Sequence, residues 1–287
     1  MKGDRTIFGF FLFGCLVTAV FILYPAYYAI ELSFYQSTSL VSQGEWVGLD
    51  NYRAVLASDD FWNAFDNGLF FAGFAILLQV VLGIGIAMLL NAAIPAQSIV
   101  RGVAILPYLL PTVVVALVFK WMLNGATGVL TRFGEMLGFG TINWFETPDA
   151  AMLSVIVLSV WIWTPFVVVS VLAGLQSIPQ ELYAAAKVDG ATAWQQFWHI
   201  TLPQLRPVLT VVVLLRGIWM FNKFDIVWLM TQGGPLRSTE HLPILAYRMA
   251  FERFDLGQGA AIATISFLML SAVVLVYFKF FPLEEKS

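Results

Sequence analysis

The stretch ELYAAAKVDGATAWQQFWHITLP, residues Glu181–Pro203, decides how this sequence folds. It is about as long as a membrane-spanning helix but far more polar. The alanines Ala184–Ala186 favour helix, and the Asp189–Gly190 pair is a signal for a stop and a turn. The residues Ala191–Ile200 can form a second short helix. We therefore predict a helix–turn–helix lying at a membrane surface, a rigid projection that can fit a groove on a partner protein.

Long apolar segments lie on both sides of this stretch. A helix needs about 20 mostly apolar residues to cross the hydrocarbon layer of a membrane. Inside lipid every backbone donor must be satisfied within its own segment, so segments of this length are predicted to be helices. Six segments qualify: Ile7–Ile30, Phe70–Leu90, Val103–Leu123, Met152–Leu175, Val208–Met230 and Ala260–Phe281. The predicted fold class is all-α, a polytopic membrane protein with six transmembrane helices.

The composition requires the same class. Hydrophobic residues make up 60% of the 287 residues and charged residues 11%, with a mean hydropathy of +0.82. A soluble domain is nearer half apolar and a quarter charged. The net charge of -3 and the pI near 5.4 argue against a nucleic-acid partner, since no basic patch is available for phosphates. The single cysteine, Cys15, excludes an intramolecular disulfide.

The first segment begins like an export signal, because Lys2 and Arg5 precede an apolar run. That run, Ile7–Ile30, is longer than the roughly 7–15 residues of a signal-peptide core, and no small-residue cleavage site follows it. We predict a retained first membrane helix. The chain has no low-complexity tract, linker or clear repeat, so residues 1–287 are predicted to form one membrane domain.

Prolines and small residues mark positions where these helices are expected to bend or to touch. Each proline in or near a span removes a backbone hydrogen bond, so local bends or breaks are expected there. These prolines are Pro25, Pro107, Pro111 and Pro165. Small residues four positions apart allow close approach of helices, which is ordinary packing more often than function. The two pairs are Gly83 with Ala87 and Gly259 with Ala263.

The fifth span carries two cations, Arg216 and Lys223, seven positions apart and so on one helix face, with Trp219 and Met220 between them. An ionisable residue inside a span is costly unless it faces protein or water, so this stripe indicates a polar cavity. Sugar recognition suits it, because cations bind hydroxyls and an aromatic ring stacks on the C–H face. The alternative is that Arg216 pairs with a carboxylate of a partner subunit and Lys223 snorkels to the surface.

The fourth span offers a second aromatic group: Trp161, Trp163, Thr164, Pro165 and Phe166. Pro165 cannot bond to the carbonyl of Trp161 and should loosen the helix there. For Trp161, interfacial anchoring or helix packing is the favoured interpretation.

No residue pattern for catalysis or metal binding is present. The sequence has no GxxxxGK[ST] loop, so any ATP must be hydrolysed by a different chain. His199 and His241 are isolated and do not have metal-ligand spacing. The acidic pair Asp59–Asp60 is interpreted as the cap of a helix beginning at Phe61.

Glu181–Pro203 resembles the EAA loop of ATP-binding-cassette (ABC) importer permeases, whose pattern is EAA, then DGA, then a phenylalanine and a closing LP. Ala184 replaces the glutamate of the motif. This replacement would remove one polar contact to the ATPase, but it does not change the identity of the loop. The matching residues are Ala185, Ala186, Asp189, Gly190, Ala191, Phe197, Leu202 and Pro203. Shorter motifs resemble the sugar and glycerol-phosphate, or maltose-type, branch: Gly48–Tyr52, Phe221–Asp225, Thr231–Pro235 and Ala260–Thr264.

This resemblance implies a type I ABC importer permease fold and a cytoplasmic coupling loop at about residues 177–206. It implies a multi-pass protein of the bacterial inner membrane with both termini cytoplasmic, because charge alone does not fix the orientation. The coupling residues would be Ala185, Ala186, Asp189, Gly190, Ala191 and Phe197. Carried over by position, the solute contacts would be Ile162, Trp163 and Phe166 on the fourth span and Arg216, Trp219, Met220 and Lys223 on the fifth.

The resemblance also implies the partners: a second permease subunit in a heterodimer, two ATPase subunits that bind ATP and Mg, and an extracytoplasmic solute-binding protein. The chain would carry no cofactor and no enzyme activity, and it would move a sugar-like solute or polyol through lipid by alternating access. The segments Ser33–Asn67 and Thr231–Gly257 would meet the binding protein. Two rivals remain: a membrane-embedded enzyme acting on a lipid-linked substrate, and a transporter driven by an ion gradient.

Overall fold

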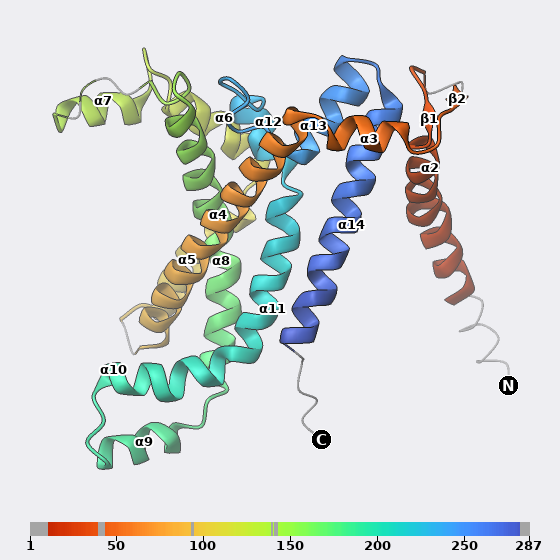
Figure 1. Ribbon diagram of the computed structural model, residues 1–287. Helices are drawn as coiled ribbons and strands as arrows, with labels where there is room; N and C mark the ends of the chain where they lie inside the picture. Colours follow the sequence, from red (N-terminus) through yellow and green to blue (C-terminus); the bar gives the residue numbers. More distant parts are fainter. Residues whose placement is uncertain (1–10, 40–43, 93–94, 139, 141–142, 282–287) are drawn as a thin grey trace, which may run out of the picture. The chain divides into compact units, whose positions relative to one another are not determined.

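The computed structural model describes residues 11–39, 44–92, 95–138, 140 and 143–281, and this part is helical apart from one two-stranded sheet and connecting turns (Figure 1). The chain divides into two compact units. Unit 1 comprises Met1–Phe65 and Leu242–Ser271, and unit 2 comprises Asp66–His241 and Ala272–Ser287. The prediction of a single domain over residues 1–287 stays a prediction, because compactness alone does not show whether the units fold separately.

Within the described residues, five helices are long and apolar enough to cross a membrane: Phe11–Leu32, Asp59–Asn91, Pro148–Gln176, Ala193–Phe221 and Leu256–Phe280. A bent pair of shorter helices passes the same test together and makes the sixth span. The predicted all-α membrane fold is therefore confirmed. Residues 7–10 of the first predicted span lie outside the described residues.

The sixth span is the predicted third segment, and it is broken. Helix α5 (Gln97–Leu109) and helix α6 (Thr112–Met122) meet at 91°. Between them Leu110 is extended, with φ -81 and ψ 142, which is the conformation that a residue before proline prefers. Pro111 is then the N-cap residue of α6, where its missing N–H removes no bond within the helix. The expected break at a proline is confirmed here, whereas Pro107 and Pro165 lie inside helices that continue past them.

The predicted boundaries of the fifth segment, Val208–Met230, are wrong at both ends. The helix begins earlier and runs without interruption through α10 (Ala193–Gln196), the π-helical turn η2 (Phe197–Thr201) and α11 (Leu202–Phe221). It stops at Asn222, and a separate helix α12 (Phe224–Thr231) follows. The break arises at Lys223, whose φ of -78 and ψ of 88 are not helical. Because the residues on both sides of the break are apolar, a count of hydrophobic residues does not detect it.

Helix α8 (Pro148–Gln176) is the centre of unit 2 and packs against α5, α6, α11 and α12. Helix α4 (Asp59–Asn91) touches it closely at Gly83, where a Cβ atom would lie 2.6 Å from Cγ1 of Val167. Small residues permit such contacts, and close packing is a main source of stability between helices in lipid. The buried core here joins α4, α8 and α11: Ala87, Leu90, Val167, Val168, Val171, Leu175, Ile178, Leu205 and Val212. Helix α7 (Val129–Met136) follows α6 in the chain.

Unit 1 is organised around a short sheet. The turn η1 (Ala19–Leu23) and helix α2 (Tyr24–Leu32) lead into strand β1 (Tyr35–Gln36), which pairs antiparallel with β2 (Glu45–Trp46). Asn51 of helix α3 (Asp50–Leu56) fixes this turn by donating from Nδ2 to the carbonyls of Ser33 and Tyr35, at 2.9 Å each.

The C-terminal helix α14 (Leu256–Phe280) packs on the same sheet at its first turn. The amide of Leu256 donates to the carbonyl of Ser37 at 2.9 Å, and a Cβ on Gly257 would collide with the carbonyl of Tyr35. Gly259 packs against Ala250, so this small-residue position serves helix packing. The remaining elements of unit 1 are α13 (Leu242–Tyr247) and η3 (Arg248–Glu252).

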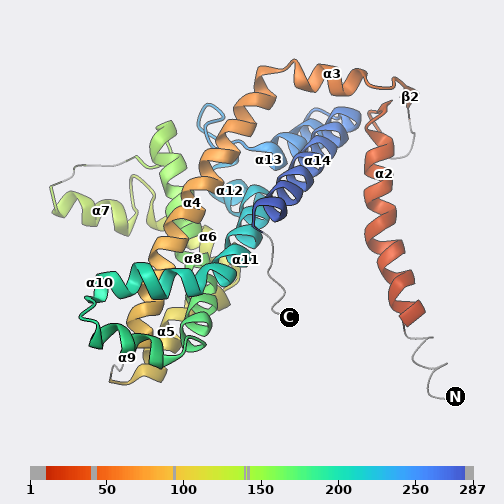
Figure 2. The same ribbon diagram turned by 60° about the horizontal axis from the view of Figure 1, so that its bottom comes forward.

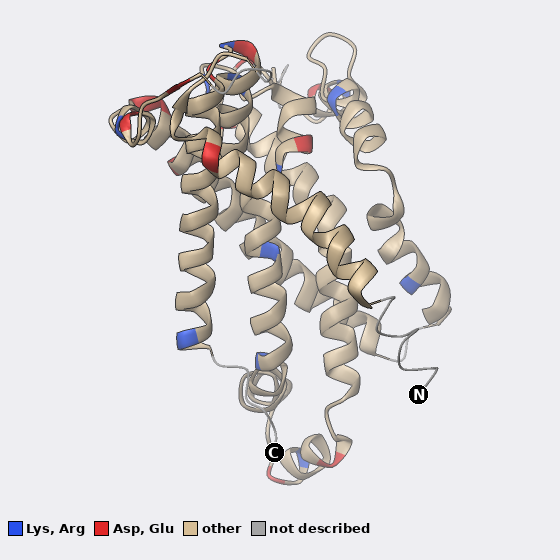
Figure 3. Ribbon diagram, turned by 90° about the vertical axis from the view of Figure 1, so that its right-hand side faces the viewer, with Lys and Arg blue, Asp and Glu red and all other residues tan. Residues whose placement is uncertain are grey.

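Charged residues are distributed as a membrane requires. In Figure 3 the acidic and basic positions lie mainly at helix ends and in connections, with few between them. The predicted helix start at Phe61 is wrong by two residues, because α4 begins at Asp59 and the pair Asp59 and Asp60 lies inside its first turn. Acidic residues are favourable there because of the helix dipole. Asp60 also lies 3.7 Å from Arg253 within unit 1.

Candidate functional site

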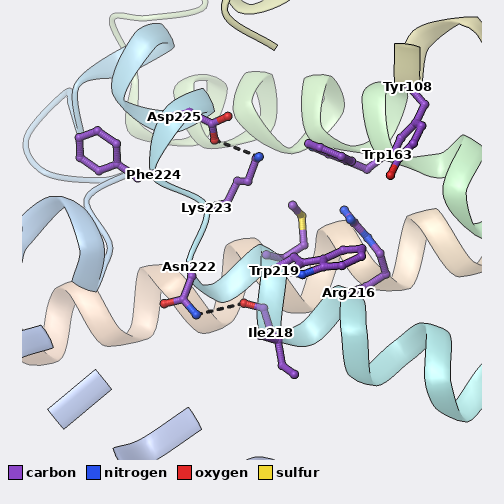
Figure 4. A pocket seen from close by; sticks show the side chains of 10 residues that line it. Tyr108, Trp163, Arg216, Ile218, Trp219, Asn222, Lys223, Phe224 and Asp225 are labelled. Carbon is purple, nitrogen blue, oxygen red and sulfur yellow. Dashed lines mark hydrogen bonds and ion pairs between the residues drawn. The ribbon is translucent and has the colours of Figure 1, made fainter. Parts of the chain in front are cut away.

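A cavity of about 580 Å³ lies in unit 2 where α11 ends (Figure 4). Its walls come from α5, α8, α11, α12 and the break between the last two helices. The lining residues are Tyr108, Trp163, Arg216, Ile218, Trp219, Met220, Asn222, Lys223, Phe224 and Asp225. Its size falls within the range of about 300–1,000 Å³ that small-molecule sites usually have.

Lys223 occupies the break and turns its side chain into the site. Its Nζ lies 3.1 Å from Oδ1 of Asp225 and 4.3 Å from the centre of the Trp163 ring. Lys223 is the N-cap residue of α12, and its carbonyl accepts a hydrogen bond of 2.8 Å from Nε2 of His241. The alternative that Lys223 snorkels to the surface is therefore not what the structure shows, because this cation is held inside unit 2.

Arg216 is buried, with 1% of its surface exposed, beside the same indole. Its guanidinium carbon lies 5.1 Å from the ring centre of Trp163 and 5.7 Å from that of Trp219. A cation near aromatic rings at these distances is attracted by their quadrupoles. Its Nε also donates to Oε1 of Gln79 at 2.7 Å. In the described residues the arginine is thus held by a neutral amide and two indoles.

Gln79 is the functional candidate that the sequence reasoning missed. It is fully buried and joins three helices, because its Nε2 also reaches the carbonyl of Ser159 at 3.4 Å and the sulfur of Met220 at 3.6 Å. A signal for it existed, since Gln79 is the one polar side chain in the apolar run Phe70–Leu90. Polar residues at membrane depth usually face a partner or a cavity.

Aromatic rings form the rest of the wall. Tyr108 packs edge-on against Trp163, with ring centres 5.5 Å apart, and Phe166 packs against Trp219 at 5.3 Å. Tyr108 and Phe166 are also in contact, at 6.4 Å. Flat apolar faces beside fixed cationic donors suit a solute with many hydroxyl groups, because its C–H faces can stack while its oxygens accept hydrogen bonds.

A second feature is the helical hairpin between α8 and α11. Its first arm, α9 (Gln180–Val188), ends in a Schellman motif, in which Gly190 adopts a φ of +78. The amide of Ala191 donates to the carbonyl of Ala186 at 2.8 Å, and the amide of Gly190 donates to that of Lys187 at 3.1 Å. These bonds satisfy carbonyls at the helix end and fix the turn.

The second arm starts with a capping box. The amide of Thr192 donates to Oε1 of Gln195 at 2.8 Å, while Oγ1 of Thr192 accepts from the amide of Gln195 at 3.3 Å. The two arms lie side by side (Figures 1 and 2), joined by a hydrogen bond of 2.9 Å between the hydroxyls of Tyr183 and Thr201. The hairpin is therefore a preformed rigid element.

Large apolar side chains remain exposed on this hairpin. Val188 is 88% exposed, and the indoles of Trp194 and Trp198 are also exposed. Phe197 is half-buried and packs against both indoles, with ring centres 6.0 and 5.3 Å away. Rigid exposed aromatics of this kind are common at protein–protein contacts.

Residues 79–281 match the protein family described as "Binding-protein-dependent transport system inner membrane component". This match extends over more than half of the chain. The chain belongs to this family. A permease component of this kind is a multi-pass membrane protein, in agreement with the apolar helices described above.

Named relatives include other permeases of this family. The chain is 34% identical, over 92% of its length and 89% of the relative's, to the "Trehalose/maltose transport system permease protein MalF" of Thermococcus litoralis. It is 33% identical, over 93% of its length and 87% of the relative's, to the "Sulfoquinovosyl glycerol transport system permease protein SmoG" of Agrobacterium fabrum.

A solved structure shares the fold. The chain matches a subunit in the crystal structure of "a bacterial ABC transporter involved in the import of the acidic polysaccharide alginate" with a TM-score of 0.87 and 22% identity, covering 99% of this chain and 98% of the other. At this identity the likeness concerns the fold alone. The predicted type I ABC importer permease fold is confirmed.

The structure brings most of the predicted solute contacts together. Those that line the cavity are Trp163, Arg216, Trp219, Met220 and Lys223. Phe166 packs behind Trp219, and Ile162 is buried without lining the cavity. Trp161 stacks on Phe119, with ring centres 6.4 Å apart, in keeping with a packing role. That these residues bind a solute stays a prediction.

The predicted helix–turn–helix is confirmed, with one difference in its second arm. We expected this arm to end near Ile200 and a new span to open at Pro203. Instead η2 continues directly into α11, whose first turn contains Pro203. Proline is tolerated in a first turn, and here the preceding π-helical turn keeps the chain helical.

The two histidines have no metal site in the described residues, where no group of three or more potential ligands occurs. His199 is exposed, and its Nδ1 lies 2.9 Å from the carbonyl of Gln195. His241 is buried, and burial lowers its pKa from 6.5 to about 4, against a raising effect of its bond to the carbonyl of Lys223. The imidazole is therefore neutral at pH 7, with Nε2 carrying the proton.

Proposed function

We propose that this chain is a permease subunit of an ATP-driven importer that carries a sugar or a related polyol by alternating access. Membership of the family supports transport, and relatives named for trehalose/maltose and sulfoquinovosyl glycerol support a saccharide. The aromatic and cationic cavity at the end of α11 is the solute site in this proposal. Trp163, Phe166 and Trp219 supply stacking surfaces, Met220 an apolar contact, and Arg216 and Lys223 hydrogen-bond donors.

The observation that carries the proposal is the rigid hairpin formed by α9 and α10. Its turn is fixed by the Schellman motif at Gly190 and the capping box at Thr192, and apolar side chains on it are exposed. The hairpin lies at one end of the helices of unit 2 (Figure 1). A transporter driven by an ion gradient, or an enzyme acting on a lipid-linked substrate, gives such an element no role. A coupling helix that docks into an ATPase subunit explains it.

The partners follow from that role. They are a second, homologous permease subunit in a heterodimer, two ATPase subunits that bind ATP and Mg, and an extracytoplasmic solute-binding protein. A related fold has been solved as a "bacterial alginate ABC transporter in complex with alginate pentasaccharide-bound periplasmic protein". ATP is hydrolysed in the ATPase subunits, so this chain itself is not an enzyme.

Coupling runs along one helix in this proposal. When the ATPase subunits close, they move the hairpin, and the helix from Ala193 to Phe221 carries that movement to Arg216 and Trp219. The cavity then faces opposite sides of the membrane in turn. The hairpin lies in the cytoplasm, both chain termini lie on the same side, and the membrane is the bacterial inner membrane.

The test is the substitution Gly190→Ala in the transporter assembled with its ATPase subunits. A Cβ at this residue meets nothing within 4 Å, so only the backbone at φ +78 is strained, by about 1–2 kcal/mol. We expect the turn to distort and the stimulation of ATP hydrolysis by the sugar-loaded binding protein to fall about fivefold or more. ATPase rate in proteoliposomes is the measurement.

Gly138→Ala is the matched control, because Gly138 has a φ of +85 and equally open surroundings but lies after α7, away from the hairpin. It should lose a similar amount of stability and keep full ATPase stimulation. The proposal fails if no ATPase subunit co-purifies with the wild-type chain. The coupling role alone fails if the loaded binding protein stimulates ATP hydrolysis as strongly in the Gly190→Ala transporter as in the Gly138→Ala transporter.

A further inference from the structure

The charges in the cavity do not balance. Its wall holds two cations, Arg216 and Lys223, and one carboxylate, Asp225. The carboxylate lies 3.1 Å from Lys223 and therefore neutralises that lysine. In the described part of the chain, no acidic side chain forms a salt bridge with Arg216. One positive charge is left at the cavity.

Gln79 is the reason why this charge stays uncompensated. Its Oε1 accepts from Nε of Arg216 at 2.7 Å, which is where a carboxylate would form an ion pair. The amide instead orients the guanidinium without cancelling its charge, and its Nε2 bonds to Ser159 and Met220 fix the amide in turn. Both Gln79 and Arg216 are almost completely buried, so water screens the charge poorly.

The wall also has donors without acceptors. Nη2 of Arg216 and Nε1 of Trp163 are buried and have no hydrogen-bond partner in the described residues. Both residues line the cavity, and in Figure 4 the guanidinium lies beside the indole of Trp163. Buried donors are nearly always paired in proteins, so a bound molecule that supplies oxygen acceptors would complete this site.

From these observations we propose that the cavity selects saccharides that carry one acidic group, a carboxylate or another oxyanion, and that Gln79 is the positioning residue that keeps the charge of Arg216 available to it. This inference rests on the proposed function, since it names the class of solute carried. A ligand oxyanion would pair with the remaining positive charge, while the sugar rings stack on the aromatic wall.

The experiment compares two ligands that differ only in charge. One is a trisaccharide ending in a single glucuronate, and the other is the same trisaccharide with that carboxylate reduced to an alcohol. Binding is measured by calorimetry on the assembled transporter in detergent, without the binding protein, so that only the permease cavity selects. We expect the wild-type transporter to bind the acidic form about tenfold more tightly or better.

Gln79→Glu is the decisive variant, because it keeps the shape of the side chain and places a negative charge against Arg216. It should weaken binding of the acidic ligand about tenfold and change that of the neutral ligand less than about twofold. Gln204→Glu is the matched control, since Gln204 is exposed on the same helix as Arg216 and outside the cavity. It should change neither affinity.

A second variant keeps the test decisive if Gln79→Glu does not assemble. Asp225→Asn removes the carboxylate that neutralises Lys223, and the preference for the acidic ligand should then rise several-fold.

Equal affinity of the wild-type transporter for both ligands would overturn the inference, as would a Gln79→Glu variant that weakens the binding of both ligands equally. If the neutral sugar is imported with ATP hydrolysis and no preference appears, only this inference fails. If no saccharide binds or stimulates ATP hydrolysis, the proposed function fails as well.

Discussion

His241 shows how a single buried side chain supports the break that shapes the cavity. Its Nε2 donates to the carbonyl of Lys223 at 2.8 Å, and its ring packs against Phe71, with ring centres 6.0 Å apart. Gly68 leaves room for it, since a Cβ there would already lie 3.4 Å from the Cβ of His241. The imidazole thus holds the backbone of Lys223, the residue at the break between α11 and α12.

The burial of His241 predicts a loss of stability in acid. Its pKa is about 4 in the folded protein and 6.5 when unperturbed, so the unfolded chain takes up a proton first as the pH falls. The stabilising contribution is complete above pH 6.5 and is lost progressively down to pH 4, by about 3 kcal/mol in total. The melting temperature of the purified transporter, measured between pH 7.5 and 4.5, tests this.

His241→Gln should flatten part of that pH dependence, because glutamine does not titrate. His199→Gln is the control, since His199 is exposed and the chain has only these 2 histidines. A His241→Gln variant whose melting temperature falls with pH as steeply as that of the wild type would contradict the prediction.

At the scale of residues, the sequence predicted the residues that line the cavity better than the buried residues that hold them in place. Helical spacing predicted that Arg216 and Lys223 share one helix face; this is wrong, because α11 ends before Lys223, yet both residues line the cavity. An aromatic residue between two cations did indicate a polar site within a span. The partner of Arg216 could not be found in this way. Gln79 lies 137 positions away in the chain, and no local pattern states which buried polar groups meet.

At the scale of elements, the contact between α4 and α8 depends on a missing side chain. Gly83→Ala would place its Cβ 2.6 Å from Cγ1 of Val167, and strain of this kind in a packed core costs about 1–3 kcal/mol. We expect a lower melting temperature of the detergent-solubilised protein. Gly85→Ala, on the same helix but with open space around it, should be neutral or slightly stabilising, because alanine favours helix over glycine.

A double substitution separates packing from other causes. Val167→Ala removes the closer of the contacting atoms, so Gly83→Ala combined with Val167→Ala should recover part of the lost stability. If the two effects simply add, close packing at this point is not what Gly83 provides.

Hydrophobic length predicted which segments are helices, but not where helices break. The bend between α5 and α6 could be anticipated because Pro111 marks it. The end of α11 could not, because Asn222, Lys223 and Asp225 are a few polar residues within a longer apolar stretch. Nothing local distinguishes them from residues that continue a helix, and the aromatic and ionic contacts of Lys223 favour the break.

At the scale of the whole molecule, the hairpin and the loop after α12 lie at opposite ends of unit 2 (Figure 1). The proposed orientation places Val188 in the cytoplasm and Leu236 outside, and both side chains are almost fully exposed, at 88% and 89%. In a Cys15→Ser background, a membrane-impermeant maleimide should label Leu236→Cys in intact cells. It should label Val188→Cys only in inverted vesicles.

The reverse labelling pattern would place the hairpin outside and remove its role in coupling. Labelling of both positions from one side would contradict a single membrane crossing by α11. Sequence charge could not decide this orientation, because the basic residues are divided almost evenly between the two sides, and the prediction rests on the hairpin motif.

The π-helical turn η2 has a geometric consequence for everything that follows it. Successive residues of a helix are rotated by about 100° around its axis, so the number of residues before α11 sets the angular phase of that whole helix. Removal of a single residue from Phe197–Thr201 would leave the length and composition of α11 unchanged. It would nevertheless turn Arg216 and Trp219 away from Trp163 by more than a quarter of a revolution. The number of residues in η2, five, therefore sets the rotation of α11 relative to the hairpin, and with it the direction in which Arg216 and Trp219 face.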